Sequence, residues 1–204
     1  MSKTDKLKNR IDYVIEEYKK QADSHSKALQ AIRRDYANDA LSNQLQGEDE
    51  KHASTLASLS ASLKSATDEV ENLVSEVNRK LSAPVSNEAL NALQVLRMRK
   101  DISAHEIEAF KDRYGDNFNV LFALQEIAGE SGITIKSALE GQSDGLTASA
   151  VLNRLNDLQA YIGQIKTAIT TDSGLLGVGV AHTLTMQQIN ALESHLDALD
   201  SYAE

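Results

Sequence analysis

Residues 52–77 read HASTLASLSASLKSATDEVENLVSEV, and seam-forming side chains recur along them at alternating steps of four and three residues. The recurring positions are His52, Leu56, Leu59, Leu63, Ala66, Val70, Leu73 and Val77. A heptad of this kind keeps one stripe on one side of a helix, so it predicts a long helix with a continuous seam. The pattern is typical of a helical rod and does not describe an active site.

A second stripe precedes the first one in the chain. It consists of Leu7, Ile11, Val14, Tyr18, Ala22, His25, Leu29, Ile32 and Tyr36. The extra-long step from Tyr18 to Ala22 indicates a stutter, which relaxes a supercoil locally. The first 82 residues contain no proline and one glycine, Gly47. We therefore predict helices over residues 4–45 and 49–82, joined by a turn at residues 46–48.

The two predicted helices can use their stripes in two ways. A short connection favours antiparallel packing within one chain. The same heptads could instead join two chains, and both arrangements could hold at once. In either case we expect the seam of the hairpin or oligomer to contain Leu7, Ile11, Val14, Tyr18, Leu29, Ile32, Leu56, Leu59, Leu63, Val70, Leu73 and Val77.

Helix-start signals dominate the rest of the chain. An apolar residue, then Ser or Thr, then an apolar residue four positions after it is an N-cap with a hydrophobic staple. The capping residues are Ser86, Ser103, Thr147 and Thr185, and Glu106 and Gln188 complete capping boxes with the second and fourth of these. The predicted helices span 86–100, 103–114, 117–128, 147–170 and 185–202. Gly115 and Gly129 fall where C-terminal caps belong.

These elements predict an all-α fold with two parts. Residues 1–83 form a long antiparallel, coiled-coil-like hairpin, and residues 84–204 form a small, compact helical bundle with glycine-rich connectors at 129–146 and 171–184. Charge changes along the chain as well. Residues 1–100 hold 16 Lys and Arg against 15 Asp and Glu, whereas residues 101–204 hold 5 against 15. An acidic back half does not favour nucleic acid or an anionic membrane as partners.

Composition narrows the class of protein further. The absence of cysteine excludes disulfides, thiolate nucleophiles and cysteine zinc sites. Aromatic residues make up only 4% of the chain, which suits helical seams better than a large enzyme core. No apolar run approaches the roughly 18 residues of a membrane span, and Met1–Arg10 lack the apolar segment of a signal peptide. We expect an intracellular, soluble protein, neither secreted nor membrane-bound.

Sites for chemistry are not evident in the sequence. The five histidines do not make HExxH or another metal-ligand spacing, and His25 and His52 fall on the seams, where they tune register. The carboxylates follow exposed helix faces, and there is no GxSxG motif. We therefore expect no catalytic, cofactor-binding or metal-binding residues, and no cofactor.

The segment from Gly174 to His182, GLLGVGVAH, is unusual. It could be a packed connector or an adaptable apolar segment that becomes ordered on a partner. The helix after it carries one apolar face, which could close the bundle or dock into a groove. Residues of this region that could contact a partner are Leu175, Leu176, Val178, Val180 and Met186.

Residues 103–128, SAHEIEAFKDRYGDNFNVLFALQEIA, resemble a piece of small helical proteins from tailed phages of Gram-positive bacteria. The resemblance covers about an eighth of the chain, and capping and packing residues carry it. It implies a role in virion assembly, as a scaffold or minor structural protein, and carries no functional residue across.

We therefore expect a non-enzymatic structural protein that associates with itself and with other phage structural proteins. The resemblance implies that it is found in the host cytoplasm or in a virion. The alternative expectation is a helical adaptor or inhibitor that binds one host or phage protein.

Overall fold

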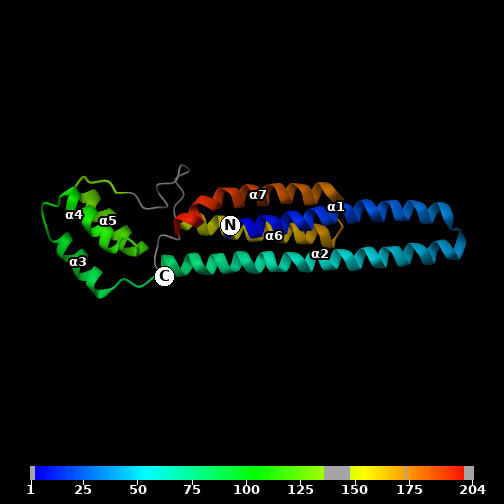
Figure 1. Cartoon of the computed structure of the whole chain (residues 1–204), viewed down its shortest axis with the longest axis horizontal. Helices are drawn as coiled ribbons and strands as arrows, with labels where there is room; N and C mark the ends of the chain where they lie inside the picture. The colour runs from blue at the N-terminus through cyan, green and yellow to red at the C-terminus, as the bar shows by residue number, and fades with distance from the viewer. Residues whose placement is uncertain (1–2, 136–147, 173, 200–204) are drawn as a thin grey trace. The chain divides into compact units, whose positions relative to one another are not determined.

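The computed structural model describes residues 3–135, 148–172 and 174–199. It is all-helical over these residues, as predicted, with no strand among them. The helices are α1 (Lys3–Asp35), α2 (Asn38–Leu81), α3 (Asn87–Arg97), α4 (Ala104–Tyr114), α5 (Phe118–Glu130), α6 (Ala148–Thr170) and α7 (Gly174–Leu199), as labelled in Figure 1. They form two compact units: residues 1–71 with 156–190, and residues 72–155 with 191–204.

Four helices pack in an antiparallel arrangement in the first unit. α1, α2, α6 and α7 lie side by side in Figure 1, and side-chain contacts confirm the neighbours. Arg10 of α1 pairs with Glu69 of α2 at 3.2 Å, and His182 of α7 lies 2.7 Å from Asp12 of α1. Gln159 and Thr170 of α6 reach Glu71 and Ser60 of α2. Because partner numbers rise on one helix as they fall on the other, adjacent helices run in opposite directions.

The core of this unit is built from one stripe of each helix. Its buried members are Leu7, Ile11, Val14, Ile15, Tyr18, Leu56, Leu59, Leu63, Ala66, Val70, Leu158, Ile162, Ile165, Ile169, Val178, Ala181 and Ile189. They recur at three- and four-residue steps, so each helix turns one face inward. The heptad stripes predicted on α1 and α2 therefore face a four-helix core in this region, and not only each other.

The turn between α1 and α2 is not where we predicted it. It lies at Tyr36 and Ala37, and Asn38 begins α2 with a φ of 51°. Asparagine tolerates this left-handed region better than most residues. Gly47 lies inside α2, and a Cβ on it would meet no atom within 4 Å. The predicted turn at residues 46–48 is therefore wrong.

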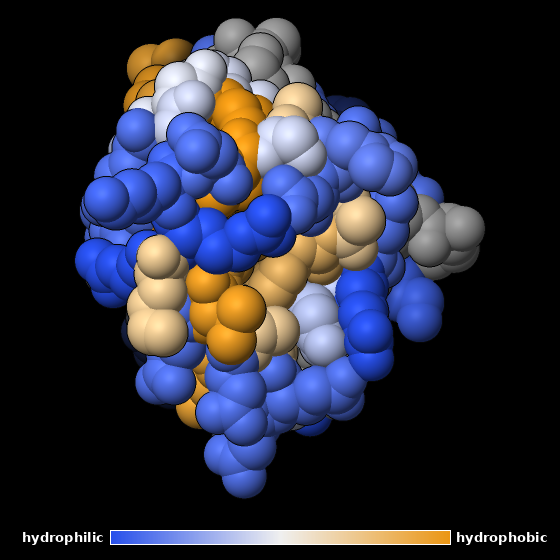
Figure 2. All heavy atoms as spheres, turned by 90° about the vertical axis from the view of Figure 1, so that its left-hand side faces the viewer, coloured by the Kyte–Doolittle hydropathy of each residue, from blue (hydrophilic) through white to orange (hydrophobic). Residues whose placement is uncertain are grey.

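The second unit contains α3, α4 and α5, with α5 contacting the other two. Its buried cluster is Ala89, Leu93, Leu96, Ile107, Val120, Leu124, Ile127 and Ala128. Ser86 and Ser103 cap α3 and α4 as predicted, and Glu106 completes the predicted capping box. Apolar patches alternate with hydrophilic side chains on the face shown in Figure 2. The exposed apolar residues of this unit include Leu90, Val95, Met98 and Phe122.

Glycine ends α5 one turn later than we predicted. Gly129 lies within α5, so it is not the C-terminal cap. Gly132 takes the left-handed φ of 72°, and the Ile133 N–H donates to the Ala128 carbonyl at 2.8 Å. This is a Schellman motif, with Ile133 packed against the buried cluster. Gly115 does cap α4 as predicted.

The last helix begins earlier than we predicted. α7 starts at Gly174, so the predicted connector over 171–184 is mostly helical. Thr185 is buried inside α7 and donates its hydroxyl to the Ala181 carbonyl at 2.7 Å, so it caps nothing and forms no capping box with Gln188. The predicted cap Thr147 and most of the connector over 129–146 lie outside the described residues. The predicted domain division at residues 83 and 84 stays a prediction.

Candidate functional site

The side chains between α1 and α2 are buried along one part of this helix pair and not along the other. Tyr18 is the last buried residue of α1, and His52 is the first buried residue of α2. None of residues 21–50, all of them described, is buried. We call residues 21–50 the distal hairpin; at 1.5 Å per residue, the α1 part of it is about 22 Å long. In Figure 1 this segment continues past the ends of α6 and α7.

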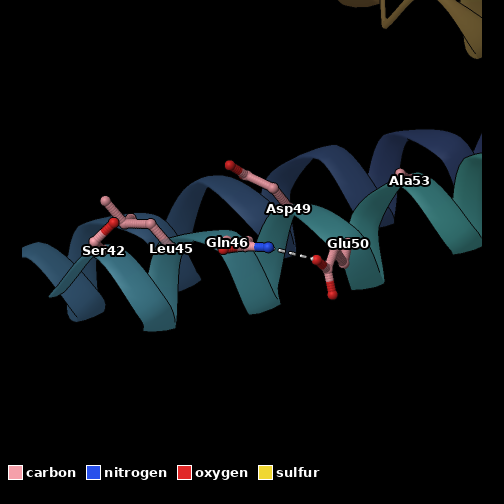
Figure 3. Close-up of a pocket in the computed structure, with 6 residues that line it drawn as sticks. All are labelled: Ser42, Leu45, Gln46, Asp49, Glu50 and Ala53. Carbon is pink, nitrogen blue, oxygen red and sulfur yellow. Dashed lines mark hydrogen bonds between the residues drawn. The ribbon is translucent and has the colours of Figure 1, made fainter. Parts of the chain in front are cut away.

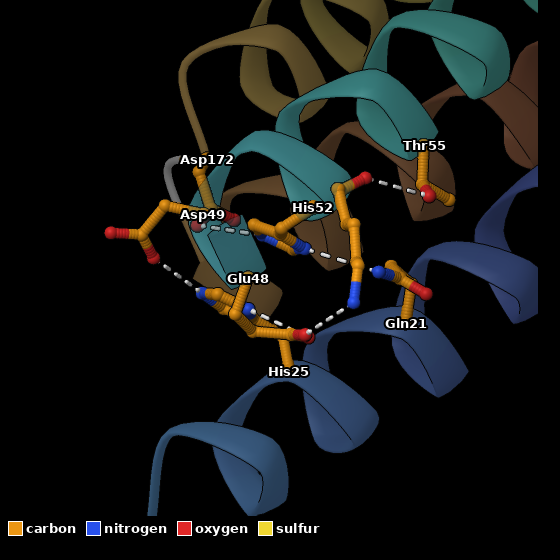
Figure 4. A network of polar contacts seen from close by, with 8 residues as sticks. Gln21, His25, Glu48, Asp49, His52, Thr55 and Asp172 are labelled. Atoms are coloured by element: carbon orange, nitrogen blue, oxygen red, sulfur yellow. Dashed lines mark hydrogen bonds and ion pairs between the residues drawn. The ribbon is translucent and has the colours of Figure 1, made fainter. Parts of the chain in front are cut away.

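A polar network lies at the base of the distal hairpin, where α6 ends (Figure 4). The imidazole rings of His25 and His52 stack with centroids 3.9 Å apart and an interplanar angle of 1°. His52 Nε2 lies 3.2 Å from Asp172 Oδ2, and Gln21 Nε2 lies 3.4 Å from His52 Nδ1. With the Gln21 amide in this orientation it donates to Nδ1, so His52 Nε2 carries the hydrogen that Asp172 accepts.

Asp172 joins this network to the buried core. Its Oδ1 accepts a hydrogen bond of 3.0 Å from the hydroxyl of Tyr18. Burial raises the pKa of Tyr18 to about 12, and the hydrogen bond to the Asp172 carboxylate adds to the effect. Asp172 itself has a φ of 47°, a left-handed conformation that aspartate tolerates. The residue therefore fixes the end of α6 against both α1 and α2.

Acidic side chains surround His25. Its Nδ1 atom is buried and makes no hydrogen bond to the described residues; Glu48 Oε1 lies 3.7 Å away. Its Nε2 atom lies 3.5 Å from Asp49 Oδ1. Lys51 approaches Glu48 at 3.9 Å, on the exposed side. The local excess of carboxylates makes this region favourable for an incoming cation.

The network joins three helices. Both ring nitrogens of His52, on α2, have partners: Gln21 on α1 and Asp172 at the end of α6. Among the described residues, no group of three or more His, Asp or Glu side chains is arranged to hold a metal ion. The contacts of His52 hold α1, α2 and the end of α6 together.

An open groove runs along α2 from this network toward the tip of the hairpin. Its first part is lined by His25, Asp49, His52, Ala53, Leu56, Ala57, Thr170, Thr171 and Asp172. Its second part is lined by Ser42, Leu45, Gln46, Asp49, Glu50 and Ala53, and Figure 3 shows these side chains along one side of α2. Asp49 and Ala53 belong to both parts, so the groove begins where α6 ends and continues over the distal hairpin.

The predicted seam residues divide into two groups. Leu7, Ile11, Val14, Tyr18, Leu56, Leu59, Leu63, Val70, Leu73 and Val77 are buried. Leu29 and Ile32 are only half-buried, because they lie in the distal hairpin, which α6 and α7 do not cover. Leu41 and Leu45 of α2, which we did not predict, are half-buried as well.

The predicted partner-contact residues divide in the same way. Leu175, Leu176 and Val180 are exposed, Leu176 to 87%, and with Leu184 they line a shallow hollow on α7. Val178 is buried in the core and Met186 is half-buried, so Val178 does not offer a contact. Leu175 and Leu176 come three and four residues after Asp172, which lines the start of the open groove.

Sequence reasoning missed Asp172 and the acidic side chains around His25. Asp172 is 120 residues from His52 and follows a helix end with no motif around it. Glu48 and Asp49 gave a signal that we did not use: they fall where the heptad of α2 would continue backwards from His52.

No family model, curated protein or solved structure matches this chain. In the part of the chain that the structure describes, no helix combines the length and apolar character needed to cross a membrane.

Proposed function

We propose that this chain is a non-enzymatic structural protein that associates with itself through the distal hairpin. The observation that carries the proposal is the change in burial along one pair of helices. Between Leu56 and Val70, α6 and α7 cover the seam of α1 and α2, whereas at Leu29, Ile32, Leu41 and Leu45 the same seam is half-open. Covering these apolar side chains contributes favourable free energy at about 25 cal/mol per Å².

In this proposal the predicted long hairpin and the predicted small helical bundle have separate roles. The hairpin supplies the self-associating surface. The α3–α5 cluster, with exposed Val95, Met98 and Phe122, is available for a different contact. The proposed setting is assembly of a phage virion, and it rests on the resemblance of residues 103–128 to small helical proteins of tailed phages.

The mass of the full chain in solution tests self-association. One chain has a mass of 22.3 kDa. Multi-angle light scattering at micromolar concentration should give a multiple of this mass. A strict monomer would contradict the proposal.

One observation favours a second candidate, a helical adaptor that binds one other protein. Leu175, Leu176 and Val180 form an exposed apolar patch on one helix, at a spacing that suits docking against a partner. Co-purification from infected or expressing cells separates the two candidates. Homo-oligomers with capsid or portal proteins support assembly, whereas a monomer bound to one host protein in equal amount supports the adaptor.

A further inference from the structure

We propose that the partner of the distal hairpin is the distal hairpin of a second copy, paired antiparallel about a two-fold axis near Leu29 and Leu45. This rests on the proposed self-association and specifies its geometry. The pairing would make a symmetric four-helix bundle in which each copy's helices take the place that α6 and α7 occupy further along α1 and α2. Three features of the surface support it.

The first feature is continuity of the groove. It starts at Thr170 and Asp172, where α6 stops, and runs on past Asp49 and Ala53 to Ser42. A helix lying in it would extend the line of α6 along α2. The groove is lined by small side chains at Ser42, Ala53 and Ala57, which permit a helix to approach closely.

The second feature is charge. Near the tip of the hairpin Arg33 is exposed, while Arg34 pairs with Asp35 at 2.7 Å. Asp49, Glu50 and Asp172 lie near the base. A two-fold axis at Leu29 and Leu45 brings the level of Arg33 in one copy to the level of His25 and Asp49 in the other, because each lies four residues from the axis. Arg33 of each copy then meets the acidic base of its partner.

The third feature is the match of exposed apolar side chains at the ends. Tyr36 is exposed at the tip, and Leu175 and Leu176 are exposed beside the base. The antiparallel pairing brings each tip to the partner's α6–α7 end. Tyr36 of each copy then covers Leu175 and Leu176 of the other, so the contact occurs twice in the dimer. Such a self-complementary contact closes after two copies. A parallel pairing would instead set Arg33 against Arg33.

The chain has no cysteine, so introduced cysteines report on this geometry without background. Gln46→Cys, one residue from the axis, should link to itself through a short bismaleimide. Ala37→Cys should not link to itself but should link to a differently tagged chain carrying Leu176→Cys. Ser58→Cys, exposed on α2 opposite the covered seam, serves as the unlinked control.

Charge reversal gives an independent readout. Arg33→Glu with Arg34→Glu should weaken dimerisation about tenfold or more, and adding Asp49→Lys and Glu50→Lys should restore it. Lys19→Glu with Lys64→Glu changes charge equally on exposed positions outside the distal hairpin and should leave the dimer intact.

The outcomes separate this pairing from self-association itself. Oligomers in which Ala37→Cys links to itself, or in which Gln46→Cys does not, overturn the antiparallel pairing and leave self-association standing. A monomeric wild-type chain that forms no cross-link overturns both, and it would leave the groove to a different protein.

Discussion

Asp172 holds three side chains that lie far apart in the sequence. It accepts hydrogen bonds from Tyr18 and His52, and His52 stacks on His25. The heptad pattern predicted that both histidines lie on seams, because periodicity assigns a residue to a face. It could not predict Asp172, since a contact across 120 residues depends on where α6 ends against α2.

Removing the Tyr18 hydroxyl should destabilise the four-helix unit. Tyr18 is fully buried, so Tyr18→Phe leaves its ring in place and removes one hydrogen bond to a carboxylate. A hydrogen bond of this kind contributes about 1.5–3 kcal/mol when shielded, and because Asp172 is 48% exposed we expect about 1 kcal/mol. Urea unfolding measures the loss. Tyr13→Phe, exposed on the same helix, should change stability little; equal effects of the two changes would contradict the role of Asp172.

Glu106 gives the capping box a defined dependence on pH. Hydrogen bonds from the backbone N–H and the hydroxyl of Ser103, and then from Arg99, lower the pKa of Glu106 from 4.5 to about 2. A pKa lowered by folding gives stability that is present above 4.5 and lost as pH falls toward 2. The melting temperature of Glu106→Gln should therefore lie below that of the parent at pH 7 and converge on it near the lower pKa.

Glu108→Gln on the same helix provides the control for this pH dependence. Glu108 is exposed, and α4 is capped by Ser103 and Glu106. Its melting temperature should follow that of the parent. A difference between Glu106→Gln and the parent that stays constant with pH would show that the carboxylate charge does not stabilise the cap.

At the scale of elements, the sequence predicted helix starts well where a cap acts locally. Ser86 and Ser103 cap α3 and α4 because a side-chain oxygen two or three residues away satisfies a free N–H. Local sequence signals did not predict the start of a helix where tertiary packing determines it. α7 begins at Gly174 despite three glycines, since Val178, Ala181 and Ile189 are buried in the core. Burial of such a face outweighs low helix propensity.

The predicted position of the turn between α1 and α2 was wrong for a related reason. Glu48 and Asp49 interrupt the apolar heptad just after Gly47, so the sequence reads as a break there. In the structure Glu48 lies in the seam opposite His25, and the helix continues through it. A polar seam residue looks the same as a helix end when only hydropathy is read.

Replacing Gly47 with alanine tests the corrected turn. In a helix interior with open space around the Cβ, Gly47→Ala should stabilise the chain by about 0.5–1 kcal/mol. Gly132→Ala is the matched opposite case, because the space is also open but φ is 72°. It should destabilise the chain by about 1 kcal/mol. Urea unfolding of both variants measures these changes in the free energy of unfolding. If Gly47→Ala destabilised the chain, the result would support a turn at residues 46–48.

On the scale of the whole molecule, the two parts of the α1–α2 pair lie in different surroundings. The proximal parts of α1 and α2 have a covered core, whereas the distal hairpin keeps Leu29, Ile32, Leu41 and Leu45 half-exposed. The sequence left open whether the heptads pack within one chain or between chains. We propose both uses, one for each half of the hairpin, because among the described residues only the proximal half has helices of its own chain beside it.

Amide hydrogen exchange measured over a range of protein concentrations tests this assignment most directly. As concentration rises and copies pair, amides in residues 24–50 of the distal hairpin, which lie beyond its base, should exchange more slowly, because a covered hairpin frays less. Amides of α5, which lie in the α3–α5 cluster, should exchange at the same rate throughout and provide the internal reference. Exchange in residues 24–50 that stays unchanged at every concentration would contradict the account.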